Sequence, residues 1–316
     1  MKKILLCILA LIIGLGLTGC NSEEPPANEN QESQKTITIG VMPDVESIPF
    51  IMAKKNGYFE EEGVKVKIVH FKSAKDRDSA LQSGILDGVI TDVLAVVFSN
   101  EGGTDLKIIS KNHGDIKLMA GKESGINALA ELKGRSIGLS SNTIMEYTAD
   151  KMLESAGLKP EDVKKMAIPP LPTRLEMLQG GKIDAAILPE PLAGLGVNNG
   201  ARVLASTDQM SNKAGAIAFT AESLQQNPEE IKAIFRAYNR GVEYLNAEPV
   251  SSYAEYIIEV QGFPAGLKDS LRLPAYEKAT APDPKIVADV LRWMETKGLI
   301  KGSYEYQDLV DDQILR

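Results

Sequence analysis

An internal repeat constrains the fold of this chain more than any other feature of its sequence. The segment 81–90 (LQSGILDGVI) matches 178–187 (LQGGKIDAAI) at a spacing of 97 residues. A second pair, 38–41 (TIGV) and 136–139 (SIGL), matches at a spacing of 98. Two similarities at nearly the same offset indicate two structural units with the same order of strands and helices.

Each copy of the repeat alternates strands with helices. In both copies of the longer match a helix ends at a glycine, which adopts a left-handed cap at low cost, and a short strand led by Asp follows. Strands at 36–41 and 136–139 precede polar loops and helices, the first helix expected over 50–62 and the second ending at Gly157. This alternation predicts two α/β lobes with parallel sheets, whose ligands bind beyond the carboxyl ends of the strands.

The length of the chain agrees with two lobes and a tail. Its 316 residues are about two domains of ordinary size. From about residue 213 a strand (216–219) and helices (228–246 and 284–297) follow, and this tail has no counterpart in the repeat. The tail is best assigned to the first lobe, so that two crossings between the lobes form a hinge. The predicted division is lobe 1 at 36–117 and 214–316, and lobe 2 at 118–213.

The N-terminus has the pattern of a lipoprotein signal peptide, predicted at residues 1–19. Two lysines precede an apolar stretch at 4–17, which is shorter than the about 20 residues of a membrane-spanning helix. The stretch ends in LTGC, which resembles the lipobox of bacterial lipoproteins, and this resemblance implies that Cys20 is lipidated and anchors the chain to the membrane. A secretory peptide that happens to contain a cysteine is the alternative. The polar segment 20–35 is predicted to be a flexible stalk.

Composition excludes several classes of function. The only cysteines are Cys7 and Cys20, so the body has no disulfide, thiolate metal site or cysteine nucleophile. Two isolated histidines, His70 and His113, disfavour a zinc site, and we expect neither metal nor cofactor. The formal charge of −8 becomes −10 once two lysines leave with the signal peptide, which argues against nucleic acid as a partner.

Four segments carry a resemblance to a known family: AKKNGYFEEEG at 53–63, residues 80–92, LKGR at 132–135, and GKIDAA at 181–186 followed by Glu190-Pro191. Through them the chain resembles, over roughly 36–300, the solute-binding lipoproteins of bacterial ABC importers for aliphatic sulfonates, nitrate, taurine and thiamine-precursor pyrimidines. The resemblance implies an α/β, two-lobed type II periplasmic-binding-protein fold that closes on a small molecule and delivers it to an ABC permease and its ATPase. It also implies an extracytoplasmic, lipid-anchored protein, which we expect to be a monomer because closure needs free surfaces.

The family geometry places ligand contacts in the loops that follow the paired strands. The candidate contacts are Asp44, Glu46 and Ser47, then Thr91 and Asp92, then Ser140, Ser141, Asn142, Thr143, Glu146 and Tyr147, and finally Glu190, which matches Asp92 in the repeat. Helix capping is the structural alternative, favoured more for Ser47 than for Asp44 and held equally open for Asp92. Tyr147 is the only aromatic residue between Phe98 and Phe219, so any stacking surface in the second lobe must be this ring.

The charge of these loops bears on the ligand. They contain five carboxylates and neither arginine nor lysine, and buried carboxylates without partners cost several kcal/mol each. This favours a neutral or cationic ligand with N–H donors, best an aminopyrimidine of the thiamine-precursor type, with a riboflavin-like or amine-bearing heterocycle also open. An aliphatic sulfonate, taurine or nitrate is the alternative within the family.

Two other classes of function stay open. Relatives of this fold include pyrimidine-forming and dehydratase enzymes, so a carboxylate-based enzyme is one alternative. No catalytic residue is predicted, because the sequence has no Gly-x-Ser-x-Gly, phosphate-loop or His-Glu-x-x-His motif. A ligand sensor is the other alternative, and the sequence does not separate it from import.

Overall fold

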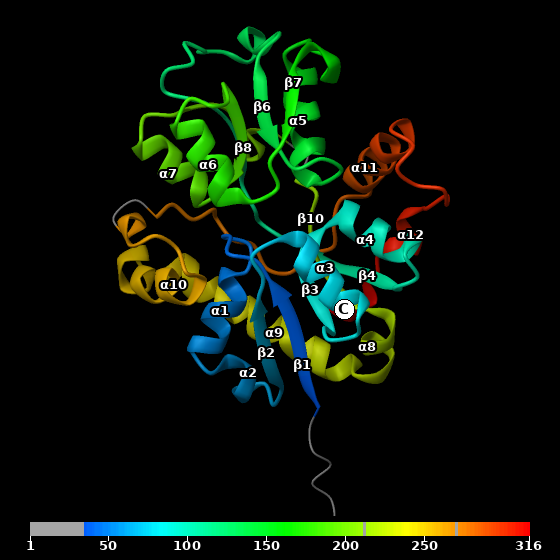
Figure 1. The fold of residues 1–316 in the computed structure, drawn as a ribbon. Coiled ribbons are helices and arrows are strands. Elements are labelled where there is room, and N and C mark those ends of the chain that lie inside the picture. Colours follow the sequence, from blue (N-terminus) through cyan, green and yellow to red (C-terminus); the bar gives the residue numbers. More distant parts are fainter. Residues whose placement is uncertain (1–34, 211–212, 269–270) are drawn as a thin grey trace, which may run out of the picture. The chain divides into compact units, whose positions relative to one another are not determined.

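The computed structural model describes residues 35–210, 213–268 and 271–316. The predicted signal peptide, Cys20 and nearly all of the predicted stalk lie outside the described residues. Residues 35–316 form one compact unit that contains two five-stranded sheets (Figure 1). None of the described helices is both long and apolar enough to span a membrane.

The first sheet has the strand order β2-β1-β3-β10-β4. Its strands are β1 (Thr36–Val41), β2 (Lys65–His70), β3 (Gly88–Asp92), β4 (Leu106–Lys111) and β10 (Gly215–Thr220). Strand β1 pairs in parallel with β2 and β3, whereas β10 runs antiparallel to both β3 and β4. The strand expected in the tail therefore joins the sheet that begins with the first strand of the body.

The second sheet repeats this arrangement in the order β7-β6-β8-β5-β9. Its strands are β5 (Ile116–Ala120), β6 (Ser136–Leu139), β7 (Lys164–Ala167), β8 (Ala185–Pro189) and β9 (Arg202–Ser206). Strand β6 is parallel to β7 and β8, and β5 is antiparallel to β8 and β9. The repeat in the sequence thus corresponds to two sheets of equal topology.

The prediction of wholly parallel sheets is wrong for one strand in each sheet. Strand β5 follows directly after the edge strand β4 of the other sheet, and β10 follows the edge strand β9 in the same way. Neither strand enters its sheet through a crossover helix, which a parallel connection needs, so both run antiparallel to their neighbours. The chain passes between the sheets at these two connections.

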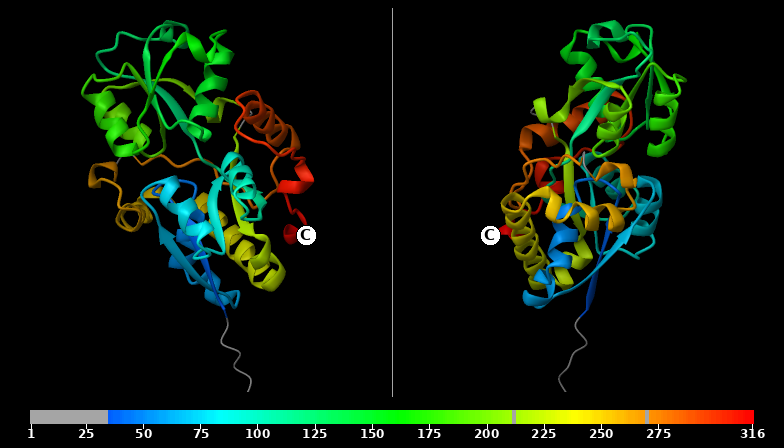
Figure 2. Two further views of the ribbon diagram at one scale, coloured as in Figure 1. Left: turned by 45° about the vertical axis from the view of Figure 1, so that its right-hand side comes forward. Right: turned by 90° about the vertical axis from the view of Figure 1, so that its left-hand side faces the viewer.

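Helices cover both faces of each sheet. They are α1 (Ile48–Lys55), α2 (Tyr58–Glu61), α3 (Ala74–Gln82), α4 (Val93–Glu101), α5 (Ile144–Ser155), α6 (Leu171–Gln179), α7 (Leu192–Asn198), α8 (Ala221–Gln226), α9 (Pro228–Ala247), α10 (Ala254–Gln261), α11 (Pro284–Thr296) and α12 (Tyr306–Leu309). The single helix expected over 50–62 is wrong, because Gly57 with φ +73° ends one helix and begins another. Figure 2 shows α5 on one side of the second sheet and α6 and α7 on the other.

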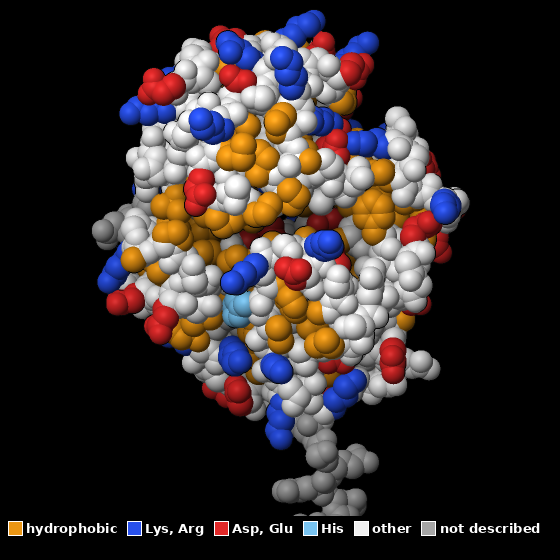
Figure 3. Space-filling view, in the orientation of Figure 1, with side chains coloured by type: hydrophobic (Ala, Val, Ile, Leu, Met, Phe, Trp, Pro, Cys, Tyr) orange, Lys and Arg blue, Asp and Glu red, His pale blue; other side chains and the backbone are white. Residues whose placement is uncertain are grey.

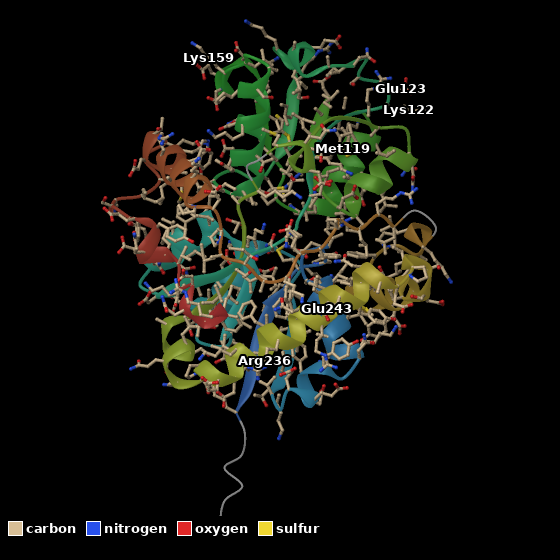
Figure 4. All side chains as sticks on the ribbon, turned by 180° about the vertical axis from the view of Figure 1, so that it is seen from behind. Met119, Lys122, Glu123, Lys159, Arg236 and Glu243 are labelled. Atoms are coloured by element: carbon tan, nitrogen blue, oxygen red, sulfur yellow. The ribbon has the colours of Figure 1, made fainter. Side chains whose placement is uncertain are left out.

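The C-terminal tail packs on the first sheet. Helix α9 lies against α1, and Figure 4, seen from behind, shows it crossing in front of this sheet with Arg236 and Glu243 along its length. Helix α11 packs against α4 through an apolar stripe of Val287, Val290, Leu291 and Met294. The tail is thereby anchored on both faces of the first sheet.

Two buried arginines extend the repeat beyond its sequence match. Arg77 on α3 and Arg174 on α6 are 97 residues apart, and both are buried. The Nη1 of Arg77 donates to the carbonyl of Ile90 at 2.8 Å, and the Nη1 of Arg174 donates to the carbonyl of Ile187 at 2.7 Å. In each lobe, therefore, a guanidinium joins a helix to the neighbouring central strand.

We predict that Arg174→Met lowers the free energy of unfolding by about 2–4 kcal/mol, because it leaves the buried carbonyls of Ile168 and Ile187 without a donor. Arg135→Met is the matched control, since Arg135 is about half exposed and pairs with Asp184 at the surface. Its expected effect is below about 1 kcal/mol. Urea unfolding followed by circular dichroism measures both, and equal losses would contradict the assignment.

Candidate ligand-binding site

A cleft of about 510 Å³ lies between the carboxyl ends of the parallel strands of the two sheets. Its residues come from the segments after β1, β2 and β3 on one side and after β6, β7 and β8 on the other. This volume is within the range of small-molecule sites. Figure 3 shows the molecule hollowed here, with acidic side chains at depth and basic ones at one edge.

Most of the residues predicted to contact a ligand line this cleft. They are Asp44, Glu46, Thr91, Asp92, Ser140, Ser141, Asn142 and Thr143. The fold brings these loops together although they lie up to about 100 residues apart, because equivalent strands of both sheets end at the same place. Their contact with a ligand remains a prediction.

Four other predicted residues, Ser47, Glu146, Tyr147 and Glu190, are not among the residues that line the cleft. Ser47 is fully buried and holds the loop after β1 in place. Its hydroxyl donates to the carbonyl of Met42 at 3.3 Å and accepts from Nε2 of Gln261 at 2.7 Å. Ser47 thus has a structural task within the first lobe.

Two of the predicted acidic residues have basic partners that the sequence did not reveal. Glu146 pairs with Lys165 at 2.8 Å and with Lys297 at 2.6 Å, and Glu190 pairs with Lys117. Burial would raise the pKa of Glu146, but the N–H of Asn142 and the two lysines outweigh it and lower this pKa to about 2. The prediction that these carboxylates have no basic partner in the protein is therefore wrong for Glu146 and Glu190.

Tyr147 does not offer its ring to the cleft. The ring is fully buried, with its centroid 5.7 Å from that of Trp293 in an edge-to-face contact. Its hydroxyl donates to Oδ2 of Asp289 at 2.8 Å. Tyr147 was predicted to stack on a ligand because no other aromatic residue lies between Phe98 and Phe219. In the structure its ring packs against Trp293 instead, because α5 places this residue toward α11 of the tail.

Asp92 caps α4 while it lines the cleft, whereas Asp44 holds the turn that precedes α1. Oδ1 of Asp92 accepts from the N–H of Ala95 at 2.9 Å, which caps α4. Oδ1 of Asp44 accepts from the N–H groups of Glu46 and Ser47 at 3.1 and 3.2 Å. Ser47 occupies the N-cap position of α1, but neither its side chain nor that of Asp44 makes a cap hydrogen bond to this helix, so side-chain capping is found for Asp92 alone of these three residues.

The carboxyls of Asp44, Glu46 and Asp92 share an environment that disfavours charge. Burial raises the pKa of Asp44 and of Asp92 to about 6, although Arg77 and hydrogen bonds from backbone N–H groups oppose the shift. Burial, together with the charges of Asp44 and Asp92, raises the pKa of Glu46 well above its usual value. Arg77 does not neutralise the group, since its guanidinium is paired with Asp78 and the Ile90 carbonyl.

Glu46 differs from the two aspartates because no hydrogen bond from a described residue reaches its carboxyl group. The carboxyl lies against Gly114, in the first connection between the sheets, and a Cβ at that position would overlap it. Glu46 therefore lines the cleft with hydrogen-bonding capacity that none of the described residues uses.

Sequence reasoning missed a group of basic residues on the first lobe. Lys72, Lys75 and Arg77 line the cleft, and the two lysines are exposed at its rim. They follow β2, whose carboxyl end lies beside that of β1 because the two strands are parallel. The rule that ligands bind beyond the carboxyl ends of parallel strands also applies to β2, and it would have identified these residues.

Metal binding has no support in the described part of the chain. No group of three or more His, Cys, Asp or Glu residues there is arranged to hold a metal ion.

Comparison with known proteins gives consistent matches. The NMT1/THI5-like family model matches residues 44–252, which include parts of both sheets. A Bacillus subtilis (strain 168) protein named for aliphatic sulfonates binding is 27% identical over 253 residues, covering 77% of this chain and 74% of that protein. The 4-amino-5-hydroxymethyl-2-methylpyrimidine phosphate synthase THI13 of Saccharomyces cerevisiae is 24% identical over 283 residues, covering 83% and 81%.

A solved structure shows the same fold. The alkanesulfonate-binding protein SsuA from Xanthomonas axonopodis pv. citri, bound to MOPS, superposes with a TM-score of 0.72 at 17% identity. The superposition covers 84% of this chain and 94% of that one. The predicted two-lobed periplasmic-binding-protein fold is thereby confirmed.

The opposite pKa shifts of Asp92 and Glu146 predict opposite effects of pH on stability. The native state binds more protons than the unfolded chain between the unfolded pKa of Asp92, about 3.9, and its native value of about 6, so stability falls as pH rises through this window. Asp92→Asn keeps a capping oxygen and does not titrate. Relative to the parent it should gain about 1–2 kcal/mol between pH 4 and pH 7, after allowance for partial exposure.

Glu146→Gln is the contrasting variant, because the native pKa of Glu146 is depressed. Its stabilising contribution is present above about pH 4.3 and is lost as pH falls through about 2, so the deficit of this variant should be largest at neutral pH and shrink in acid. Urea unfolding of the parent and both variants from pH 2.5 to 7 measures the differences. If the stability difference from the parent changed with pH in the same direction in both variants, the opposite pKa shifts of Asp92 and Glu146 would be contradicted.

Proposed function

Because the chain belongs to the NMT1/THI5-like family, we propose that it is a solute-binding protein that captures a small molecule between two lobes and delivers it to an ABC permease and its ATPase. The fold supports this, since the cleft takes its walls from both sheets and only two connections join the sheets. Such an arrangement permits closure by a hinge motion. The predicted division into lobes at about 117 and 214 is kept as part of this proposal.

The two connections are tied together at the base of the second sheet. Oδ1 of Asp115 accepts from the hydroxyls of Ser206 and Thr207 at 2.6 and 3.1 Å, and the Thr207 hydroxyl accepts from the N–H of Ile116 at 2.9 Å. These bonds fasten the start of β5 to the end of β9. They give the proposed hinge a fixed point from which each lobe can rotate.

Glu46 is the observation that carries the proposed ligand class. A partly buried carboxyl without a donor favours a ligand that supplies an N–H group or a positive charge. Asp44 and Asp92 beside it add acceptors of the same kind. We therefore propose a neutral or cationic N-heterocycle, with an aminopyrimidine of the thiamine-precursor type as the first candidate, and the name of the yeast relative agrees with this class.

An aliphatic sulfonate is the competing ligand within the same function. Lys72 and Lys75 at the rim favour an anion, and the Bacillus subtilis relative and the Xanthomonas structure are both named for sulfonates. The two ligand classes differ in what they require of Glu46. An N–H donor uses its carboxylate, whereas a sulfonate in the same position would be repelled by it.

We predict that Glu46→Gln weakens binding of an N-heterocycle at least tenfold, because a charge-assisted hydrogen bond is lost. Binding of a cationic heterocycle to the parent should also release a proton from Glu46, whose pKa is raised in the free protein. Isothermal titration in buffers of different ionisation enthalpy measures both effects. The compounds are 4-amino-5-hydroxymethyl-2-methylpyrimidine, thiamine, riboflavin, taurine and MOPS.

Glu60→Gln is the matched control, since Glu60 is exposed on α2 and does not line the cleft. It should bind every compound as the parent does. Tight binding of MOPS or taurine that is unchanged or strengthened in Glu46→Gln, with no pyrimidine binding, would overturn the proposed ligand and favour the sulfonate.

Catalysis on the same site is a second candidate function. It is favoured by Asp44 and Asp92, whose raised pKa values suit general acid–base work near neutral pH, and by the synthase name of the yeast relative. Mass spectrometry of a bound compound after prolonged incubation separates the two functions. Recovery of the unchanged compound supports a binding protein, and a product of different mass supports an enzyme.

We also propose that the protein is held outside the cytoplasm by a lipid on Cys20. Import favours this placement, because captured ligand must be released close to a permease. In a bacterial host, Cys20→Ala should move the protein from the membrane fraction to the soluble fraction and remove the mass of the acyl chains. Cys7→Ala is the control and should leave both unchanged, and membrane attachment that persists in Cys20→Ala would contradict the proposal.

A further inference from the structure

We infer that α11 of the C-terminal tail is a strap that fastens onto α5 of the second lobe and thereby sets the balance between open and closed cleft. The inference rests on the proposed function, because it assigns a consequence to hinge closure. Figure 1 shows the two helices beside each other, although they are about 140 residues apart in the chain. The strap is defined by Asp289, Trp293 and Lys297.

Asp289 makes the first set of contacts between the strap and α5. Its Oδ2 accepts from the hydroxyl of Tyr147 at 2.8 Å, and its Oδ1 accepts from Nζ of Lys151 at 2.9 Å. The carboxylate is thus shared by two donors, one turn apart on α5. Hydrogen bonds to a charged group are worth more than neutral ones.

Trp293 and Lys297 make the second set. The indole Nε1 of Trp293 donates to Oδ2 of Asp150 at 3.1 Å, and Nζ of Lys297 pairs with Oε1 of Glu146 at 2.6 Å. The same ammonium lies 4.7 Å from the centroid of the Trp293 ring. Three successive turns of the tail thereby contact four residues of α5.

Burial shows that this is more than a surface contact. Tyr147 is carried by the second lobe, yet its ring is completely buried in the apolar cluster that includes Val290 and Met294 of α11 and Val97 of α4. That cluster belongs to the first sheet, on which α11 is anchored. A residue of one lobe therefore contributes to the core of the other, and separating α5 from α11 would expose the ring to water.

The strap is connected to the cleft through Glu146. One oxygen of Glu146 binds Lys297 of the strap, and the other accepts from the N–H of Asn142, which lines the cleft. Asn142 has a φ of +57°, in the left-handed region, so its loop conformation needs such support. A continuous series of hydrogen bonds thus runs from Asn142 in the wall of the cleft through Glu146 to Lys297 in the tail.

Opening the cleft about the two connections would move α5 away from α11 and break these contacts. The strap therefore stabilises the arrangement of the lobes that the structure shows against wider opening, whether or not a ligand is present. Where the closed form is a minority, weakening it tenfold raises the apparent dissociation constant of a ligand by the same factor. Residues that never touch a ligand thus set its affinity.

The first test needs no ligand and uses Trp293, the single tryptophan of the chain. Asp289→Ala removes the first set of contacts, and Lys297→Met removes the ion pair with Glu146 from the second set. Glu295→Gln is the control, because Glu295 is exposed on α11 and its side chain makes no hydrogen bond or ion pair with a described residue of α5. Acrylamide quenching and small-angle X-ray scattering compare the full chains. Both strap variants should show greater quenching and a larger radius of gyration than the parent, while their circular dichroism spectra stay the same as that of the parent. The control variant should match the parent in all three measurements.

The second test measures ligand affinity with 4-amino-5-hydroxymethyl-2-methylpyrimidine and MOPS as the two compounds. Tyr147→Phe keeps the ring and removes one hydrogen bond, so it should weaken whichever compound binds by about five- to tenfold through faster dissociation. Unchanged quenching and scattering in both strap variants would overturn the strap and leave the proposed function intact. Altered quenching and scattering without binding of any compound would support the strap and overturn the proposed ligands.

Discussion

Antiparallel hydrogen bonding of β10 between β3 and β4 is the interaction on which the rest of the structure depends. It seats the chain in the first sheet after its return from the second, and β5 does the same in the other direction. Each sheet is therefore completed by a strand that has just left the other sheet. In the described strand order this exchange joins the two sheets through the β4–β5 and β9–β10 connections, and it places both sets of strand ends at one cleft.

The predicted acidic residues near the cleft differ in whether the protein itself supplies their partners. Glu146 and Glu190 are held by lysines, Asp92 caps a helix and Asp44 accepts from N–H groups of its own loop. Of the five carboxyls predicted as ligand contacts, Glu46 is the one that no described residue reaches with a hydrogen bond. A count of acidic residues in the loops does not reveal this difference. The proposed ligand class depends on the partner of each carboxylate rather than on the total charge.

The repeat made the topology of both sheets largely predictable, because a buried glycine or aspartate at a fixed position leaves a local signal in the sequence. Side-chain partners from distant segments left no such signal. Tyr147 was correctly identified as the single aromatic residue of the second lobe, but its burial against Trp293 depends on a tail that folds back over 140 residues later. Lys72 and Lys75 were accessible to sequence reasoning, since they come directly after β2, a strand of alternating residue types.

Arg77 and Arg174 occupy equivalent positions in the two halves, but their surroundings differ. Arg77 and Arg174 make the same bond to a central strand, yet only Arg77 stands among acidic side chains, whereas Arg174 faces the hydroxyl of Ser140 and the backbone of a proline-rich loop. One half of the cleft is therefore ionic and the other is uncharged and polar. The proposed capture of a ligand would therefore combine charged contacts on one side with uncharged contacts on the other, so that a substitution in one half leaves the charge of the other half unchanged.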